Sequence, residues 1–281
     1  MVHRMTAALL SAFLMAPAAM ASPADAAGIK EIDILCANLW GLAWPLSKDR
    51  SERLKAAPEA LNFADYDFVG LQEVWRGAYK HLEGDVRLPD VQVDSGLAVT
   101  GKLATDAPIA LHTFEASVGV ERFKRKGVLV MQLDVPDFGP VWAFVTHLQA
   151  GQSYGEIREA QARELLELVA AAPGPALILG DFNLHEGDPA DDVVAALFAE
   201  AGLRDAALVA GSDEPTYRAD NPYIWAPAGG ERFDRVYLKD GDSAALTLLE
   251  VEVLDYEQAL SDHQPVRVKV QMNQLGLVSV D

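Results

Sequence analysis

Apolar and polar positions along the chain alternate with two different periods. Apolar residues at every second position, or in short unbroken runs, are typical of half-buried and fully buried strands. Helical spacing of apolar residues predicts helices over residues 49–63, with Pro58 as a break or an end, over 155–171 and over 188–202. The predicted strands cover residues 31–39, 66–71, 91–100, 109–116, 127–135, 141–146, 176–179, 235–238, 246–253 and 266–270.

Strands outnumber helices in this pattern, and this decides the expected architecture. Each sheet must bury a face, so two sheets packed together with helices outside fit better than one doubly wound parallel sheet. The sequence contains no internal repeat, no low-complexity tract and no long linker between residues 27 and 281. We therefore expect one α/β domain over residues 27–281.

The first 26 residues have the pattern of a targeting segment. One basic residue, Arg4, precedes an apolar stretch over residues 7–21, and small residues then recur at the spacing of a signal cleavage site. The stretch is short for a membrane span. We predict a signal peptide over residues 1–26, cleaved after Ala21 or Ala26, and export to the periplasm or secretion. The alternative is a buried N-terminal helix.

Composition and charge narrow the possible functions. The chain has 281 residues, of which 50% are hydrophobic, and this argues against disorder and against a disulfide scaffold. The only cysteine, Cys36, lies in an apolar strand pattern, so we expect a buried structural thiol. The formal net charge of −19 argues against non-specific adhesion to nucleic acid or to anionic membrane. It does not argue against an enzyme that handles phosphates with a bound cation.

Polar side chains stand at the ends of many predicted strands. An Asn or Asp in such a place usually forms a turn or caps a helix, and a lone His is usually a satisfied surface or core residue. The complete set changes this interpretation, because loops carried by a rigid sheet are where sites are built. The residues are Asn38, Glu73, His147, Asp181, Asn183, Asp234, Asp262 and His263.

The residue types in this set indicate a reaction class. Converging carboxylates repel one another unless a divalent cation neutralises them. Oxygen donors such as Glu73 and Asn38 suit a hard ion, Mg²⁺ first, with Mn²⁺ or another divalent cation as alternatives. The sequence has neither paired cysteines nor a His-Glu-x-x-His helix to suggest zinc. Two histidines able to bind phosphoryl oxygens or to move protons complete a set that fits hydrolysis of a phosphate ester.

Six short motifs occur in order around these residues. They are CANLWG with Asn38, GLQEVW with Glu73, THLQA at 146–150, GDFN at 180–183, RFDRVY with Asp234, and SDH at 261–263. Together they resemble the endonuclease/exonuclease/phosphatase (DNase I-like) superfamily, from Ile32 to Val270. LQEVW, THLQA and the KGVLV segment at 126–130 look most similar to the neutral sphingomyelinase branch.

The resemblance implies a four-layer α/β/β/α sandwich with the site at one end of the paired sheets. It implies that Glu73 is the principal Mg²⁺ ligand, with Asn38 nearby on the metal or the phosphate and Asp262 on the metal side. Asp181 would orient or activate the attacking water, and Asn183 would hold a phosphate oxygen.

The resemblance also implies roles for the two histidines. His263, held by Asp234, would be the general base or a contact to the phosphate in the transition state. His147 would contact the phosphate or help the leaving group. One dense basic cluster precedes a predicted strand, and its last member, Lys126, is a candidate to bind the substrate phosphate or headgroup, with a solvated turn as the alternative. The cluster consists of Arg122, Lys124, Arg125 and Lys126.

These observations lead to a ranked set of functions. First comes an exported, Mg²⁺-dependent phosphodiesterase acting on a phospholipid headgroup, with sphingomyelin, cleaved to ceramide and phosphocholine, as the leading substrate. A secreted metal-dependent endonuclease and a sugar or inositol phosphate phosphatase are alternatives on the same scaffold. A non-enzymatic binding module is the alternative of another class. The acidity weighs against stable nucleic-acid binding, and we expect a monomer.

Contact with a lipid surface is a further expectation. Secreted toxin-type sphingomyelinases carry an aromatic-tipped hairpin before the final Asp-His, whereas residues 254–260 here are short and acidic with one aromatic residue. Tyr223, Ile224 and Trp225 lie together in sequence and are candidates for peripheral membrane contact. Packing into the core is the alternative for these three side chains.

Overall fold

Eleven strands form two sheets in the part of the chain that the computed structural model describes, residues 30–89, 93–104, 108–224, 230–256 and 258–275. In order across the first sheet lie β10 (Ala244–Val253), β11 (Val266–Gln274), β1 (Lys30–Asn38), β2 (Phe68–Gln72) and β3 (Ala98–Thr100). In order across the second lie β4 (Ile109–Thr113), β5 (Gly127–Val135), β6 (Gly139–His147), β7 (Ala176–Asp181), β9 (Asp234–Lys239) and β8 (Arg204–Asp205). Both sheets are mixed, because β1 runs parallel to β2 and β6 runs parallel to β7 while the other pairs are antiparallel.

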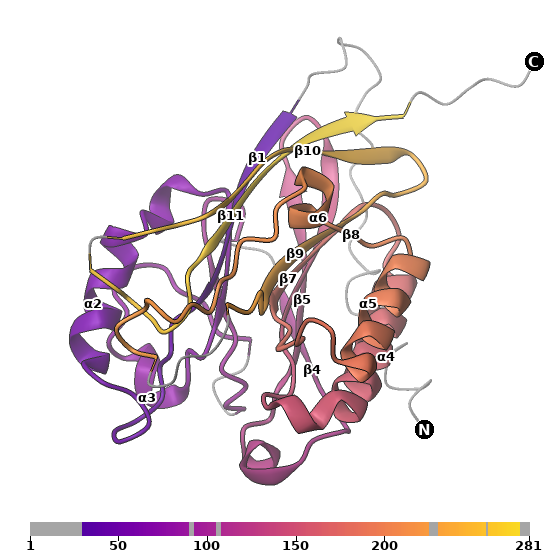
Figure 1. Ribbon diagram of the computed structural model, residues 1–281. Coiled ribbons are helices and arrows are strands. Elements are labelled where there is room, and N and C mark those ends of the chain that lie inside the picture. The colour runs from indigo at the N-terminus through magenta and orange to yellow at the C-terminus, as the bar shows by residue number, and fades with distance from the viewer. Residues whose placement is uncertain (1–29, 90–92, 105–107, 225–229, 257, 276–281) are drawn as a thin grey trace, which may run out of the picture.

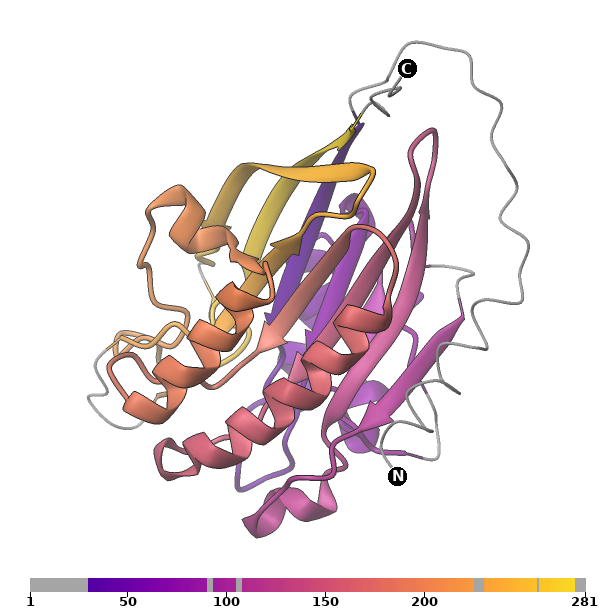
Figure 2. The ribbon, with the colours of Figure 1, turned by 90° about the vertical axis from the view of Figure 1, so that its right-hand side faces the viewer.

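Helices cover the outer face of each sheet (Figure 1, Figure 2). The first sheet is covered by α2 (Arg50–Ala60) and α3 (Arg76–Tyr79), and the second by α4 (Gly155–Ala171) and α5 (Pro189–Glu200). The remaining helical turns are η1 (Phe63–Asp65), η2 (Gly119–Phe123), η3 (Gln152–Tyr154) and α6 (Ala206–Ala210). The predicted four-layer α/β/β/α sandwich is confirmed.

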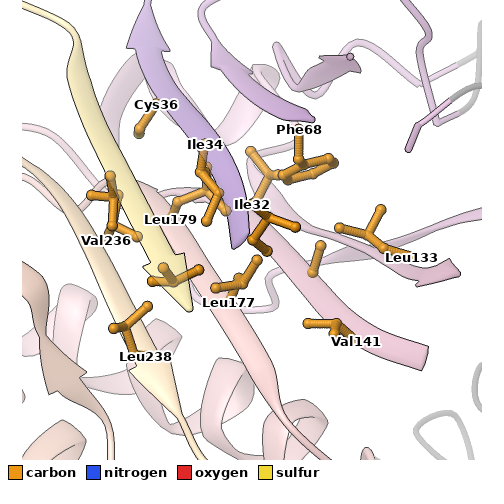
Figure 3. Packing of buried hydrophobic residues seen from close by; sticks show 14 of the residues in the cluster. Ile32, Ile34, Cys36, Phe68, Leu133, Val141, Leu177, Leu179, Val236 and Leu238 are labelled. Atoms are coloured by element: carbon orange, nitrogen blue, oxygen red, sulfur yellow. The ribbon is translucent and has the colours of Figure 1, made fainter. Parts of the chain in front are cut away.

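The main hydrophobic core lies between the two sheets. Ile32, Ile34 and Cys36 alternate along β1 and are at most 1% exposed, which is the period-two pattern of a strand with one face in a core. Figure 3 shows these side chains packed among apolar side chains of both sheets. The sheets approach closely at Gly70, where a Cβ atom would lie 2.7 Å from Leu179 Cδ1. This packing fixes the ends of the strands relative to one another.

Burial of Cys36 agrees with the predicted structural thiol. Its side chain is 0% exposed, and burial together with the charges of Asp234 and Asp181 raises the pKa of the thiol well above its ordinary value. A protonated, inaccessible thiol is a poor nucleophile.

Two predicted elements differ from the structure. The strand predicted over residues 91–100 is confined to β3, and residues 90–92 lie outside the described part. The Ser95 hydroxyl accepts a hydrogen bond from Leu97 N, as in a turn, and Asp94 accepts one from the backbone of the distant Arg76, so side chains there take the place of strand bonds. The helix predicted over residues 49–63 ends at Ala60, two residues after Pro58.

The predicted signal peptide, residues 1–26, lies outside the described residues and stays a prediction. Among the helices that are described, none has an apolar stretch long enough to cross a membrane.

A buried guanidinium ties α4 to α5. Arg158 is 0% exposed and donates through Nε and Nη2 to both carboxylate oxygens of Asp191, each at 2.7 Å. It also donates to the carbonyl oxygens of Gln149 and Gly151, in the loop that follows β6. Arg158 therefore holds both helices and that loop in one arrangement.

We expect Arg158→Ala to lower the free energy of unfolding by about 3–5 kcal/mol, because it leaves the Asp191 carboxylate buried without its partner. Arg163→Ala is the matched control on the same helix, since its bond to Glu159 is exposed and should contribute at most about 1 kcal/mol. Urea denaturation followed by circular dichroism measures both. Equal losses in the two variants would contradict this account.

Candidate active site

The ends of four strands bring chemistry-bearing side chains to one end of the sandwich. Asn38 is the last residue of β1, His147 of β6 and Asp181 of β7, while Asp234 is the first residue of the antiparallel β9. The sheet register places Asp181 directly between its neighbours, paired with His147 on one side and with Asp234 on the other. Residues that are 34 and 53 positions from Asp181 in sequence thus become its lateral neighbours.

The carboxylate of Asp181 is the centre of this cluster. Its Oδ2 accepts a hydrogen bond from Asn38 Nδ2 at 2.9 Å, and Nε2 atoms of His147 and His263 lie 3.3 Å and 3.9 Å away. Its Oδ1 accepts from the backbone N–H of Asn183 at 3.0 Å. All of these side chains except Asn183 and His263 are at most 3% exposed, so the cluster is largely shielded from bulk solvent.

His263 and Asp234 form a buried carboxylate–imidazole pair. His263 Nδ1 donates to Asp234 Oδ2 at 2.7 Å, which leaves Nε2 directed toward Asp181. The hydroxyl of Thr216 accepts from the backbone N–H of Asp234 at 3.1 Å, and the ring of Tyr217 packs against His263 with centroids 5.2 Å apart. These contacts fix the orientation of the imidazole, and the role that the resemblance implies for this pair stays a prediction.

Glu73 and Asn38 lie on the other side of Asp181, on the first sheet. Asn38 Nδ2 is 3.5 Å from Glu73 Oε1, and Trp75 Nε1 donates to Glu73 Oε2 at 3.3 Å. Glu73 adopts a left-handed backbone with φ 58°, a conformation that non-glycine residues rarely take. A Cβ at Gly41 would lie 2.2 Å from the Glu73 carbonyl oxygen, so the loop after β1 needs glycine to pass this residue. The strained turn aims the carboxylate at the site.

Lys126 meets His147 rather than standing free at the site. Its ammonium donates to His147 Nε2 at 2.9 Å, donates to the Leu148 carbonyl oxygen at 2.8 Å and pairs with Glu121 Oε1 at 2.7 Å. These contacts use its three protons. The structure thus places Lys126 beside the site, and its predicted role in substrate binding stays a prediction.

Burial and mutual repulsion change the proton affinity of the carboxyl groups. Burial raises the pKa of Asp181 to about 6, against the opposing effect of His263. Burial likewise raises the pKa of Asp262 to about 6, and the charge of Glu73 adds to this effect. The pKa of Glu73 is also raised, mainly by burial. The three carboxyl groups resist ionising together without a compensating cation.

The two histidines are shifted in opposite directions. Burial opposes the charged form of His263, but Asp234 and Asp181 outweigh it and raise the pKa of His263 well above its usual value. Burial, Lys126 and His263 lower the pKa of His147 well below its usual value. A neutral His147 and a protonated His263 therefore face the same carboxylate in the metal-free protein.

The donor set fits a hard divalent cation. Asp181, Asp234 and His263 have possible ligand atoms that all lie within 4.8 Å of one another, and because a protonated His263 has no free lone pair, the carboxylate oxygens are the donors that matter here. Asp234 Oδ1 is buried without a hydrogen-bond partner among the described residues. Glu73 and Asp262 add partly buried carboxylates whose pKa values are raised, and oxygen donors suit Mg²⁺. Which of these residues bind the ion stays a prediction.

Three positioning residues were not predicted from the sequence. Thr216 is fully buried and fixes the start of β9, and Trp75 bonds to Glu73. Arg53, on α2, donates to the carbonyl oxygens of Leu39 and Leu260, and so joins the loop after β1 to the segment before Asp262. An arginine on the apolar face of a predicted helix is the one signal that could have revealed Arg53.

The segment predicted to contact a membrane, residues 223–225, packs in part against the rest of the protein. Tyr223 and Ile224 are half-buried, and the ring of Tyr223 lies 5.2 Å from that of Trp40 and 5.3 Å from the Arg53 guanidinium. Trp225 lies outside the described residues. Membrane contact at this segment stays a prediction.

Two packed mixed sheets with helices on both outer faces, and a buried acid–imidazole site at one end, define the class of α/β/β/α sandwich proteins. The chain belongs to one family of that class. Residues 35–263 match the Endonuclease/Exonuclease/phosphatase family, as the ordered motifs predicted.

Two curated relatives match about half of the chain. Sphingomyelin phosphodiesterase 2 of Rattus norvegicus is 31% identical over 195 residues, which are 60% of this chain and 44% of the relative. Inositol phosphosphingolipids phospholipase C of Schizosaccharomyces pombe is 31% identical over 181 residues, which are 55% of this chain and 42% of the relative. The matched region thus spans less than half the length of either relative.

Solved structures share the fold over most of the chain. Sphingomyelinase C from Streptomyces griseocarneus superposes with a TM-score of 0.65 at 16% identity, over 85% of this chain and 99% of that one. D. rerio TDP2 complexed with a single-strand DNA product gives 0.68 at 17% identity, over 87% and 99%. A Staphylococcus aureus beta toxin mutant with bound magnesium ions gives 0.65 at 15% identity, over 85% and 99%. At such identities the likeness shows the fold alone.

The raised pKa of Asp262 predicts that the stability of the metal-free protein depends on pH. Because folding raises this pKa from 3.8 to about 6, the folded state holds a proton that the unfolded chain releases, and stability is lost as pH rises through that interval. We expect Asp262→Asn to stabilise the metal-free protein at pH 8 by about 1–2 kcal/mol and to have little effect near pH 4.

Thermal unfolding in EDTA across this pH range measures the effect. Asp137→Asn is the control, since Asp137 lies on the exposed β5–β6 turn with φ 65°, which asparagine tolerates. Adding Mg²⁺ should raise the Tm of the wild type more than that of Asp262→Asn. A pH-independent effect of Asp262→Asn would contradict the prediction.

The charge of Asp234 is expected to hold His263 in its protonated form. Asp234→Asn should therefore lower the pKa of His263, which NMR titration of the imidazole in metal-free protein measures. Tyr217→Phe keeps the ring that packs on His263 and changes no charge, so it should leave this pKa nearly unchanged. A pKa of His263 that moved equally in both variants would assign the shift to packing instead.

Proposed function

We propose that the protein is an exported, Mg²⁺-dependent phosphodiesterase that hydrolyses the headgroup ester of a phospholipid. Sphingomyelin is the leading substrate, with ceramide and phosphocholine as products. The observation that carries the proposal is the buried His263–Asp234 pair directed at Asp181, beside Asn38 and Glu73. Such a set combines a proton carrier, a group that can orient water and oxygen donors for a cation.

The relatives support the choice of a lipid phosphodiester. Both 31% identical relatives have names that refer to sphingolipid cleavage, one as a phosphodiesterase and one as a phospholipase C. The chain matches less than half of either, so their activities come to it only as part of this proposal. Export is supported by the pattern of residues 1–26.

Asp181 and His263 would handle the attacking water. Asp181 lies between the Nε2 atoms of both histidines, so its carboxylate orients a water placed among them and accepts a hydrogen bond from it. His263 would exchange protons through Nε2 while Asp234 stabilises its imidazolium form. In the metal-free protein this imidazole is protonated. To act as a general base, His263 would have to lose that proton, and the positive charge of a bound cation would favour the loss.

Other residues would bind the phosphate and the leaving group. Asn183 follows Asp181 with φ 51°, and its Nδ2 donates to the Leu148 carbonyl oxygen at 3.3 Å, a weak bond that a phosphate oxygen can replace. His147 would carry its proton on Nδ1, because Lys126 donates to Nε2. His147 Nδ1 is buried without a partner among the described residues and is the donor proposed for the phosphate or the leaving oxygen.

Glu73, with Asn38 and Asp262, would hold the cation on the first sheet. When bound, Mg²⁺ supplies neutralisation of charge on the phosphate and on the leaving oxygen. The carboxylates that resist ionising together would then share that positive charge.

A nuclease is the second candidate, because D. rerio TDP2 with a single-strand DNA product shares the fold. The net charge of −19 counts against it, since each phosphate contact to nucleic acid normally requires Lys or Arg. A sugar or inositol phosphate phosphatase would differ in releasing inorganic phosphate.

The direct test is hydrolysis of a panel of phospholipids, nucleic acids and sugar phosphates, with Mg²⁺ and with EDTA. We expect phosphocholine release from sphingomyelin micelles that EDTA abolishes. Glu73→Gln should remove both turnover and its Mg²⁺ dependence, because it removes a charged ligand. His263→Ala should lower kcat by about 10²–10⁴-fold or more.

Ser117→Ala, in the neighbouring loop but outside the cluster, is the control variant and should retain activity. Release of inorganic phosphate alone, or plasmid cleavage at low protein concentration without lipid hydrolysis, would replace the proposal by one of the alternatives. Near-normal turnover in Glu73→Gln or His263→Ala would refute the assignment of the site.

A further inference from the structure

Exposed apolar side chains stand on two loops beside the site. On η2, Val120 and Phe123 are each 80% exposed. On the loop between β1 and α2, Trp44 is 84% exposed and Leu46 66%. Single exposed apolar residues are ordinary, but two pairs on loops that adjoin one site need an explanation.

The η2 segment is braced against the site from its inner side. Glu121 pairs with Lys126 at 2.7 Å and accepts from the backbone N–H of Ala150 at 3.1 Å, in the loop that follows His147. Lys124 Nζ lies 4.3 Å from the ring centroid of Trp75, which bonds to Glu73. The segment is therefore held by polar contacts to both sheets while Val120 and Phe123 face solvent.

The loop after β1 is braced in a similar way. Arg53 donates to the carbonyl oxygens of Leu39, Trp40 and Lys48 at 2.8–3.1 Å, so one buried guanidinium closes both ends of the loop. Trp44 and Leu46 lie between these anchors. The two loops lie at the same end of the sandwich in both ribbon views (Figure 1, Figure 2).

We propose that Val120 and Phe123 on η2, together with Trp44 and Leu46, form a docking surface for an anionic phospholipid bilayer at the end of the sandwich that carries the site. The surface is defined by these four residues. The inference deepens the proposed function, since it explains how a site for a lipid headgroup would reach its substrate. It differs from the predicted contact through Tyr223–Trp225.

Local charge favours an anionic lipid surface over other partners. Arg122, Lys124 and Arg125 place three cations in four positions, and the one acidic residue of the segment, Glu121, is paired by the buried Lys126. Arg122 and Arg125 are exposed beside the apolar pair. The chain as a whole carries −19, so this cluster is a local exception that would orient the protein on a negative surface.

The size and shape of the surface also favour lipid. Four separated side chains on two loop tips offer much less area than a specific protein–protein interface requires. Aromatic and aliphatic tips next to cations suit the boundary between headgroups and acyl chains, where the rings enter the apolar layer and the cations meet phosphates. Because both loops are braced, they would insert with little loss of conformational entropy.

Binding is tested by cosedimentation with vesicles of phosphatidylcholine, with and without phosphatidylserine, in EDTA and without sphingomyelin. We expect the wild type to bind the vesicles that contain phosphatidylserine, and V120S/F123S to bind at least about tenfold more weakly. Arg122→Gln with Arg125→Gln should remove the preference for phosphatidylserine. These exposed substitutions should leave the Tm unchanged.

The matched control is L208S/V209S on α6, which lies away from that end in both views. Leu208 and Val209 are 64% and 52% exposed, so the change in surface apolarity is comparable. This control should bind vesicles like the wild type. An equal loss of binding in both double variants would overturn the proposal.

Trp44 provides a direct spectroscopic readout. Among the tryptophans that the structure describes, Trp40, Trp75 and Trp142 are buried and Trp44 is exposed. Vesicle binding should shift its emission to the blue, and brominated phospholipids should quench it, both effects being lost in Trp44→Phe. Binding without either effect would remove Trp44 from the surface and contradict the proposal.

Activity assays separate this inference from the proposed function. V120S/F123S should hydrolyse the water-soluble diester bis(p-nitrophenyl) phosphate like the wild type but act more slowly on vesicles. His263→Ala should lose hydrolysis and keep vesicle binding.

Absence of vesicle binding by the wild type would overturn the docking surface even if the enzyme is active. Self-association that V120S/F123S abolishes, without lipid binding, would assign the surface to a second copy of the chain.

Discussion

The hydrogen bond from Asn38 to Asp181 joins the two sheets at the site, and the chemistry depends on it. Asn38 ends a strand of the first sheet and Asp181 ends a strand of the second, so a 2.9 Å contact requires both sheets to be packed in one fixed register. The apolar core between the sheets favours one arrangement, because a one-residue slip in the pairing of a strand would turn its apolar side chains away from the core. The packing of the two sheets that stabilises the core therefore also sets the geometry of the site.

The second constraint is that the site buries several carboxyl groups close together. The acidity of the chain therefore has its strongest effect at the site. Asp181 and Asp262 have pKa values raised to about 6, and Lys126, whose charge acts on Asp181, is already engaged by Glu121 and His147. The protein alone thus leaves its carboxylates under-compensated, which fits a site able to hold a cation. The net charge of −19 opposes nucleic acid over the whole surface, whereas the site itself needs added positive charge.

Two buried arginines show how the surrounding loops are kept in place. Arg158 holds the loop after β6 through carbonyl oxygens, and Arg53 does the same for the loop after β1. Each guanidinium replaces several backbone hydrogen bonds that irregular loops cannot make among themselves. Loops fixed in this way can carry both the polar site and the exposed apolar tips beside it without a regular secondary structure of their own.

The sequence by itself determined the layers of the fold and identified polar residues that the structure gathers at one end of the sandwich. Alternating apolar residues such as Ile32, Ile34 and Cys36 specify strands with one face in a core, and polar residues at the strand ends specify where a site can form. Only the tertiary structure decided which atoms meet: that Lys126 bonds to His147, that Arg53 braces a loop, and that residues 93–97 form no strand. Strand pattern depends on neighbours along the chain, whereas these contacts depend on the register between sheets and on side chains brought together from distant positions.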